Sequence, residues 1–476
     1  MKPLAYNPYL PPWEYVPDGE PHVFDGRVYV YGSHDAPGGS NYCPGHYVCW
    51  SAPVDSLGDW HYEGIIFRRE DDPSDPDGSG ALFAPDVCQG PDGLYYLYYA
   101  LSASHAIGVA VCDTPAGHYR FLGNIRMPDS SELSPESGYG MTFDPAVYVE
   151  GRDVWLYYGF GLPFHGPERH DLGGYAARLD LDMVTLAEAP RLVVPGPELS
   201  RGTPYEAHPF FEASSMRKLN GRYYFVYSSL QGHELCYATG DSPDGPFTFG
   251  GVIISNGDVG LPGHETEVQA VNYMGNNHGG LVQAGKQVYI FYHRHTHGIQ
   301  YSRQGCAEPV TILPDGSIPQ VEITSCGLNG GPLPARGEYS AHIACALHGP
   351  EGPKRFSSKI KRSAADPAIT QEPDASPTSA NLFIGNLCQG SGCGFKYFSF
   401  TGGERTLRLE LRGTMQGTAT LHLDRENGPA AASVAVGSSD RWQYAAAPLQ
   451  VPAGKHAVYL TFAGEGICDL NAIAFE

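Results

Sequence analysis

The sequence has no long apolar run and few basic residues. No stretch approaches the roughly 20 consecutive apolar residues of a membrane span. The first residues form neither an apolar signal segment nor a cleavage site, so we expect a cytoplasmic protein. The 30 lysines and arginines stand against 52 acidic residues, a formal net charge of −22. Such a surface repels phosphate backbones and anionic lipids, which excludes nucleic acid and membrane from the expected partners.

Paired cysteines with zinc-binding spacing are also missing. The eleven cysteines are scattered and odd in number, and no CxxC pair occurs among them. We therefore expect buried, reduced thiols rather than a disulfide framework or a zinc site.

Glycine, proline and aromatic residues are abundant. The chain has 60 Gly, 40 Pro, 31 Tyr and 20 Phe among 476 residues. Many turns and short aromatic runs are typical of an all-β protein, and the length suits two or three domains.

An internal repeat organises the first 325 residues. Five times, a polar residue precedes a short strand-like run, a glycine-containing turn and an aromatic run such as GLYYLYYAL at 93–101. The opening polar residues are Asp18, Asp86, Asp144, Glu212 and His278. They lie 58 to 68 residues apart, and each copy holds two further strand-like runs. The repeat therefore predicts four strands per copy.

Five four-stranded copies predict a five-bladed β-propeller over residues 1–325. The first strand of each blade lines the central channel, so the five polar residues are expected to converge there. Residues 326–338 are rich in Gly and Pro, as is typical of a linker. Residues 339–476 hold alternating runs that predict a jelly-roll-like β-sandwich, with a polar loop at 363–380.

Several motifs resemble glycoside hydrolase family 43 over residues 5 to 320. They are NPYLP at 7–11, Pro17-Asp18 ahead of Val28-Tyr29, APDV at 84–87, FDPAV at 143–147, Glu212 ahead of Tyr223-Tyr224, His278, and YHR at 292–294. The C-terminal region resembles the carbohydrate-binding modules of family 6. The resemblance implies an inverting glycoside hydrolase.

Inverting hydrolysis needs a base for water and an acid for the leaving oxygen, roughly 6.5–9.5 Å apart. The resemblance implies that Asp18 is the general base and Glu212 the general acid. Asp144 would orient that acid and raise its pKa, as a neighbouring negative charge does. Asp86 is expected to be structural.

The first motif departs from the family pattern, in which a proline follows the base directly. Here Pro17 precedes Asp18, and Glu20-Pro21 is a shifted alternative. The spacing to Val28-Tyr29 favours Asp18, while Glu20 is expected to contact sugar hydroxyls or a water.

Other residues are candidates for substrate contacts. Phe83 would form an apolar wall for a sugar, and His34 and Asp35 would lie at the pocket rim. Arg294 is expected to reach substrate hydroxyls, with a structural ion pair as the alternative.

His278 is a candidate for both substrate and metal binding. In the family this histidine lies beside a calcium or sodium ion, so a structural calcium is expected there and no other cofactor is required. Hard cations prefer oxygen ligands, so a core histidine remains the alternative. In the sandwich, Trp442 is either a sugar platform or a core residue.

The expected substrate is a plant cell-wall oligosaccharide. The resemblance implies an exo-acting α-L-arabinofuranosidase or β-D-xylosidase acting on arabinoxylan fragments, and YGSHD at 31–35 together with the sandwich favours arabinose. A non-catalytic sugar-binding propeller would lack one of the three carboxylates, and none is missing. Phosphorolysis would need a phosphate site, for which YHRHTH at 292–297 is the candidate. Oligomeric state is not predicted.

Overall fold

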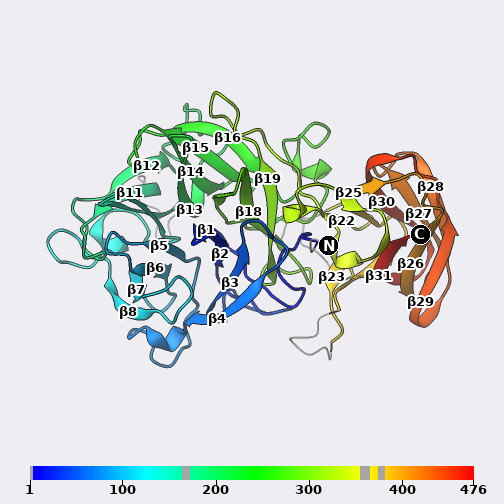
Figure 1. Cartoon of the computed structure of the whole chain (residues 1–476), viewed down its shortest axis with the longest axis horizontal. Coiled ribbons are helices and arrows are strands. Elements are labelled where there is room, and N and C mark those ends of the chain that lie inside the picture. The colour runs from blue at the N-terminus through cyan, green and yellow to red at the C-terminus, as the bar shows by residue number, and fades with distance from the viewer. Residues whose placement is uncertain (1–3, 163–171, 354–364, 374–380) are drawn as a thin grey trace.

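The computed structural model describes residues 4–162, 172–353, 365–373 and 381–476, which form two β domains side by side (Figure 1). Within these ranges the regular elements are strands and short 3₁₀ turns, so the predicted all-β class is confirmed. No described helix is long and apolar enough to cross a membrane. The 3₁₀ turns are η1 (Arg69–Asp71), η2 (Pro135–Ser137), η3 (Glu267–Gln269), η4 (Gly327–Asn329) and η5 (Ala341–Ile343).

The first domain is a five-bladed β-propeller, as the repeat predicts. Each blade is an antiparallel sheet whose first strand lies nearest the channel, and β1, β5, β9, β13 and β17 pack beside one another. The strands are β1 (Glu20–Phe24), β2 (Arg27–Tyr31), β3 (Tyr47–Pro53), β4 (His61–Phe67), β5 (Asp86–Gln89), β6 (Tyr95–Ala100), β7 (Ile107–Cys112), β8 (Arg120–Asn124), β9 (Ala146–Glu150), β10 (Asp153–Phe160), β11 (Gly173–Leu179), β12 (Arg191–Pro195), β13 (Phe210–Leu219), β14 (Arg222–Ser229), β15 (Leu235–Gly240), β16 (Thr248–Ile254), β17 (Leu281–Ala284), β18 (Gln287–His295) and β19 (Arg303–Val310).

The aromatic runs are buried because both faces of a blade pack against neighbouring blades. In β6, Tyr95, Leu97 and Tyr99 join the core shared with blade 1. The alternate residues Tyr96 and Tyr98 join the core shared with blade 3. Successive side chains of a strand point to opposite faces, so a continuous apolar run is what such a blade requires.

The fifth blade differs from the expected four strands: its sheet holds three, β17, β18 and β19. The N-terminal segment lies along the free edge of β19. The backbone N–H of Tyr9 donates to the carbonyl of Gly305 at 3.2 Å, and the Asn7 side chain exchanges hydrogen bonds of 3.1 and 2.9 Å with the backbone of Ala307. The first residues of the chain thus close the ring on its last blade.

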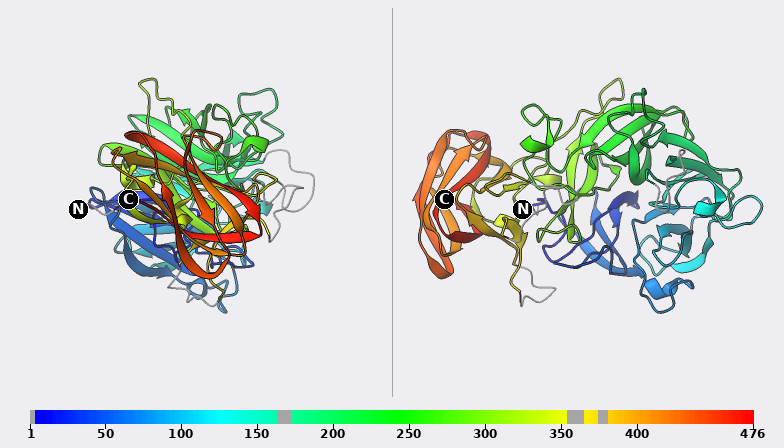
Figure 2. Two further views of the ribbon diagram at one scale, coloured as in Figure 1. Left: turned by 90° about the vertical axis from the view of Figure 1, so that its right-hand side faces the viewer. Right: turned by 180° about the vertical axis from the view of Figure 1, so that it is seen from behind.

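The second domain is a β-sandwich of two six-stranded sheets (Figure 2). One sheet has the order β20-β25-β30-β27-β28, with β22 on β25. The other has the order β23-β24-β31-β26-β29, with β21 on β31. The strands are β20 (Leu333–Pro334), β21 (Gly337–Ser340), β22 (Ala346–His348), β23 (Ala368–Thr370), β24 (Phe383–Cys388), β25 (Gly392–Phe400), β26 (Thr406–Gly413), β27 (Gln416–Leu423), β28 (Ala430–Val436), β29 (Ser439–Pro448), β30 (Gly454–Glu465) and β31 (Ile467–Phe475).

Two segments expected to be irregular contribute strands to this sandwich. Within 326–338, β20 pairs with β25 because Leu333 is fully buried in the sandwich core. Within 363–380, β23 pairs with β24, and residues 363, 364 and 374–380 lie outside the described residues. The linker expected at 326–338 is therefore part of the second domain.

Charged side chains join the two domains. Nζ of the buried Lys396 lies 2.6 Å from Oδ2 of Asp258 and 3.0 Å from Oε2 of Glu322, both in the propeller. Removing one partner of such a buried pair leaves an uncompensated charge, so these contacts couple the sandwich to the propeller. All eleven cysteines are free thiols, as predicted.

Candidate active site

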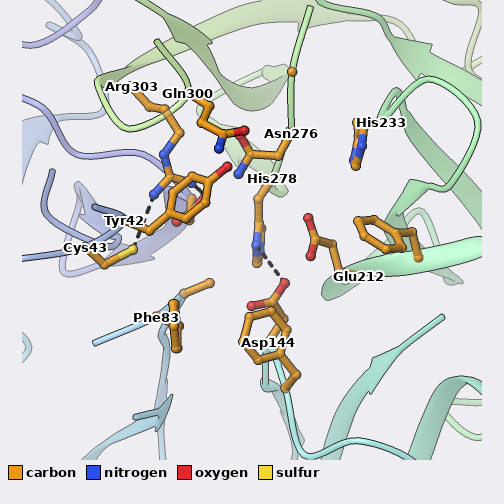
Figure 3. Close-up of a pocket in the computed structure, with 15 residues that line it drawn as sticks. Tyr42, Cys43, Phe83, Asp144, Glu212, His233, Asn276, His278, Gln300 and Arg303 are labelled. Carbon is orange, nitrogen blue, oxygen red and sulfur yellow. Dashed lines mark hydrogen bonds and ion pairs between the residues drawn. The ribbon is translucent and has the colours of Figure 1, made fainter. Parts of the chain in front are cut away.

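The channel of the propeller opens into a pocket of about 290 Å³ (Figure 3). This volume is near the lower end of the roughly 300–1,000 Å³ of small-molecule pockets. Four of the five polar residues that open the repeats line it: Asp18, Asp144, Glu212 and His278. The fifth, Asp86, binds His22 at 2.6 Å and accepts from the backbone N–H of Val147 at 2.8 Å, outside the pocket.

Unusual backbone conformations aim these carboxylates. Asp18, Asp144 and Ala213, the neighbour of Glu212, have φ of 57°, 46° and 68°. Few residues other than glycine adopt this left-handed region, although Asp tolerates it better than most. Such strain gathers at functional sites because the surrounding structure must hold it in place.

Gly32 supports the loop that carries Asp18. A Cβ atom on Gly32 would lie 2.3 Å from the carbonyl oxygen of Pro17 and 2.8 Å from a methyl group of Val16. Real Cβ atoms do not approach a carbonyl oxygen so closely, so only glycine fits against this loop.

Asp18 is held as a carboxylate by two neighbours. Nη1 of Arg303 lies 2.9 Å from its Oδ1, and Nδ1 of His293 lies 3.3 Å from the same oxygen. Burial raises the pKa of Asp18, but the charge of Arg303 and the contact with His293 outweigh burial and hold the pKa below the usual aspartate range. Asp18 is therefore ionised near neutral pH.

The pKa of Glu212 is shifted in the opposite direction from that of Asp18. Burial, and then the negative charge of Asp144, raise its pKa well above the ordinary value. The charges of His278 and Arg303 act in the other direction but do not cancel this effect. These shifts favour the protonated form of Glu212 in the same pocket that favours the ionised form of Asp18, and such a division separates acid from base roles.

Asp144 connects the acid to a buried cation. Its Oδ2 accepts a hydrogen bond of 2.9 Å from the backbone N–H of Ala213 and lies 3.5 Å from Nδ1 of His278. Burial lowers the pKa of His278, but the charge of Asp144 and the contact with it outweigh burial and raise the pKa to about 9. His278 is thus an imidazolium beside Asp144.

Arg303 was not predicted from the sequence. Besides Asp18, it holds Asp35 with two hydrogen bonds, from Nε at 2.8 Å and from Nη2 at 3.0 Å, and its Cζ lies 5.0 Å from the centre of the Tyr42 ring. Arg303 begins β19 opposite His295 of β18. The available signal was an arginine at the start of the otherwise largely apolar run RQGCAEPV.

Arg294 does not line the pocket, contrary to the expectation. Its guanidinium donates to the carbonyls of Ala344 at 3.0 Å and His342 at 2.6 Å, where the second domain packs. The reason is strand alternation: His293, one residue earlier on β18, points toward Asp18, so Arg294 points away from it.

Three other expected contacts also lie outside the pocket. His34 binds the carboxylate of Glu14 at 2.9 Å. Asp35 contacts the site indirectly, through Arg303 and through the backbone N–H of Cys43, which donates to its Oδ1 at 3.1 Å. Glu20 is buried in the channel, where it accepts from Ser215 at 3.0 Å and from Arg217 at 2.8 Å.

Phe83 does line the pocket, together with other aromatic residues. Its ring centre lies 5.3 Å from that of Phe143, and Phe160 links Phe143 to Phe211 at 5.5 and 4.8 Å. Aromatic faces of this kind suit the apolar face of a sugar ring. In the sandwich, Arg412 covers the ring of Trp442, with Cζ 4.3 Å from the ring centre.

The surroundings of His278 do not fit the expected calcium. Calcium binds six to eight oxygens at roughly 2.3–2.6 Å. Nε2 of His278 lies 3.8 Å from Oε1 of Glu20, whose other oxygen is already paired with Arg217.

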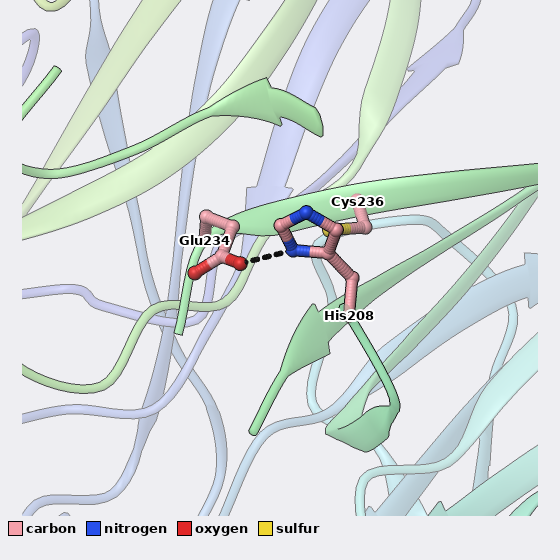
Figure 4. Close-up of side chains that lie close together, drawn as sticks. All are labelled: His208, Glu234 and Cys236. Atoms are coloured by element: carbon pink, nitrogen blue, oxygen red, sulfur yellow. Dashed lines mark hydrogen bonds and ion pairs between the residues drawn. The ribbon is translucent and has the colours of Figure 1, made fainter. Parts of the chain in front are cut away.

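A second group of possible metal ligands lies on blade 4 (Figure 4). Nδ1 of His208 is 2.5 Å from Oε1 of Glu234, which also accepts from Ser229 at 2.7 Å. Burial raises the pKa of the Cys236 thiol well above its ordinary value, and metals bind the thiolate. His208, Glu234 and Ser229 therefore form a hydrogen-bonded support for the blade, beside the Cys236 thiol.

Comparison with known families decides the class of protein. Residues 22–318 match Glycosyl hydrolases family 43, and residues 364–476 match Carbohydrate binding module (family 6). The chain belongs to glycosyl hydrolases family 43. It is a glycoside hydrolase with a family 6 carbohydrate-binding module on the C-terminal side of its propeller.

Similar proteins share both domains or the propeller alone. The chain is 46% identical over 473 residues to a protein of Thermoclostridium stercorarium named xylosidase/arabinosidase, covering 99% of each chain. A β-xylosidase/α-arabinofuranosidase structure from a compost metagenome, with xylotriose, is 27% identical, with a TM-score of 0.52 over 68% of this chain and 97% of that one. A Bacillus subtilis arabinoxylan arabinofuranohydrolase structure is 20% identical, with a TM-score of 0.51 over 99% of both chains, and shows the shared fold.

Placing Asp18 correctly should depend on the glycine behind its loop. In Gly32→Ala the new methyl group must displace Pro17, and a shift of about 1 Å at a catalytic group costs about 100-fold in rate. We expect kcat/KM on an aryl glycoside to fall by about that factor. Gly437→Ala, where no atom lies within 4 Å of the new Cβ, serves as the control. Wild-type activity in Gly32→Ala with an unchanged unfolding midpoint would contradict this account of the loop.

Proposed function

We propose that the enzyme is an inverting exo-glycosidase that releases L-arabinofuranose or D-xylose from arabinoxylan-type oligosaccharides. The observation that carries the proposal is a single pocket that holds Asp18, whose pKa is lowered by Arg303, and Glu212, whose pKa is raised by burial and Asp144. The relatives named xylosidase/arabinosidase and arabinoxylan arabinofuranohydrolase support the choice of sugars. The small volume of the pocket supports removal of single terminal sugars.

The proposed reaction needs the carboxylates and one water. Asp18 takes a proton from the water as its oxygen attacks the anomeric carbon. The glycosidic C–O bond breaks, and Glu212 gives its proton to the departing oxygen. Attack and departure on opposite faces invert the anomeric centre. The proposal requires no cofactor.

Asp144 is assigned the role of keeping Glu212 protonated and placed. Its charge is the largest electrostatic influence that raises the pKa of Glu212 after burial. Its hydrogen bond to the N–H of Ala213 fixes the backbone beside that acid. Arg303 has the opposite effect on Asp18, because its positive charge lowers the pKa of that carboxyl group.

Both proposed catalytic carboxyls should be essential. Asp18→Asn and Glu212→Gln remove the base and the acid, each of which contributes about 10²- to 10⁴-fold. We expect losses of this size in kcat on oligosaccharides with unchanged circular dichroism, and little effect from Asp55→Asn on the surface. Near-normal Asp18→Asn combined with an inactive Glu20→Gln would instead make Glu20 the base.

The stereochemistry of the product tests the reaction itself. Proton NMR of the first-formed sugar should show the anomer opposite to that of the substrate, since water attacks directly. Retention of configuration, or a trapped glycosyl-enzyme, is incompatible with the proposed roles.

The role of Asp144 should be visible in the pH dependence. Asp144→Asn removes a negative charge, so the pKa of Glu212 falls and the acid is lost at lower pH. The alkaline limb of kcat/KM should therefore move to lower pH. Aryl glycosides need less protonation and should lose less activity than oligosaccharides. An unmoved alkaline limb with equal losses on both substrates would restrict Asp144 to binding or folding.

A further inference from the structure

A second set of charged residues fills the channel below the pocket. Glu20, His22 and Asp86 offer ligand atoms that all lie within 4.8 Å of one another, and all three are largely buried. Carboxylates and an imidazole gathered at this spacing would suit a bound cation. The pocket chemistry described above does not use these three residues.

The guanidinium of Arg217 already occupies this position. From β13, its Nη2 lies 2.8 Å from Oε2 of Glu20, 3.0 Å from the carbonyl of Pro21 and 3.2 Å from Nε2 of His22. The side chains of Arg217 and Glu20 are 13% and 1% exposed. A metal ion bound to Glu20 would lie next to this permanent positive charge in a poorly solvated channel, where like charges repel strongly.

The local packing also leaves little room for a hydrated ion. A Cβ atom on Gly280 would lie 2.5 Å from Oε2 of Glu20 and 2.6 Å from Oγ of Ser215. Any side chain at position 280 would collide with the Glu20 carboxylate and the Ser215 hydroxyl, so these two groups already fill the space beside Gly280. Calcium requires six to eight oxygens around it.

A line of alternating charges connects Arg217 with the active site. Above Arg217 is Glu20, whose Oε1 lies 3.8 Å from Nε2 of His278. The other nitrogen of His278 faces Asp144 at 3.5 Å. Neither Oε1 of Glu20 nor Nε2 of His278 makes a hydrogen bond within the described residues. Arg217 pairs with Glu20 from below, and Asp144 contacts the opposite nitrogen of His278.

We propose that Arg217 is a built-in cation that takes the place of a metal ion in the channel. As a positioning residue it fixes Glu20, so that His278 stays on Asp144 and the enzyme works without a divalent cation. The inference uses the proposed function only for its activity readout.

Activity measurements test whether the enzyme works without a divalent cation and depends on Arg217. We expect wild-type kcat/KM to be unchanged by EDTA and by added CaCl₂. Arg217→Ala should lose about 10- to 100-fold, the range seen when a supporting partner of a site is removed. Low concentrations of guanidinium chloride should restore part of that loss, and Arg217→Lys should keep most of the activity. Arg222→Ala, whose guanidinium binds the carbonyl of Asp315 outside the channel, should behave as wild type.

Calcium binding tests, without reference to catalysis, whether Arg217 takes the place of a metal ion beside Glu20. Isothermal titration of the wild type with CaCl₂ should show no binding that depends on Glu20, so the wild type and Glu20→Gln should give the same heats. Calcium should raise the unfolding midpoint of Arg217→Ala more than that of the wild type, because the emptied position exposes Glu20.

Two results would overturn the proposal. One is wild-type activity that is lost in EDTA and restored by CaCl₂. The other is calcium binding by the wild type that disappears in Glu20→Gln; this holds even if Arg217→Ala fails to fold. An enzyme inactive on pentosides that nevertheless passes the calcium test would refute the proposed function and leave the role of Arg217 intact.

Discussion

Five carboxyl groups, those of Asp18, Glu20, Asp86, Asp144 and Glu212, lie buried along the poorly solvated axis of the propeller, and their need for compensating charge governs the site. A buried anion is costly unless it is paired or neutralised. Asp18 pairs with Arg303, Asp144 with His278, and Glu20 with Arg217. Glu212 forms no salt bridge among the described residues and lies near Asp144, so it keeps its proton. The cationic partner of Asp18, and the lack of one for Glu212 among the described residues, therefore match the proposed roles of base and acid.

The fold supplies this distribution by joining distant parts of the chain. Arg303 meets Asp18 across 285 residues, and Arg217 meets Glu20 across 197. The ring that brings them together is closed by Asn7 and Tyr9 on the edge of β19, so the N-terminal residues contribute to the geometry of the pocket. Left-handed backbone at Asp18 and Asp144 then aims their carboxylates into it.

The repeat made much of this predictable. Each sequence repeat forms one blade, and the blades are arranged around a single axis. Residues at the same position of the repeat, namely Asp18, Asp144, Glu212 and His278, therefore meet at the channel. Partners outside the repeat were harder to find. Arg303 begins β19, the third strand of its blade, whereas the recurring motif covers only the first two strands. Arg294 was preferred, although alternation along β18 turns it away from the pocket. The missing fourth strand of blade 5 and the strand β20 in the connector depend on long-range pairing that local composition does not encode. Cytoplasmic location stays a prediction.

The most direct test of the account is the protonation state of Glu212 at neutral pH, measured by infrared difference spectroscopy of the free enzyme. The spectrum of the wild type minus that of Glu212→Gln should contain the carbonyl band of a protonated carboxyl group. That band should persist in Asp18→Asn, since Asp18 is already ionised. A difference spectrum that shows only carboxylate bands for Glu212, or a protonated band that vanishes in Asp18→Asn, would contradict the division of roles between the two residues.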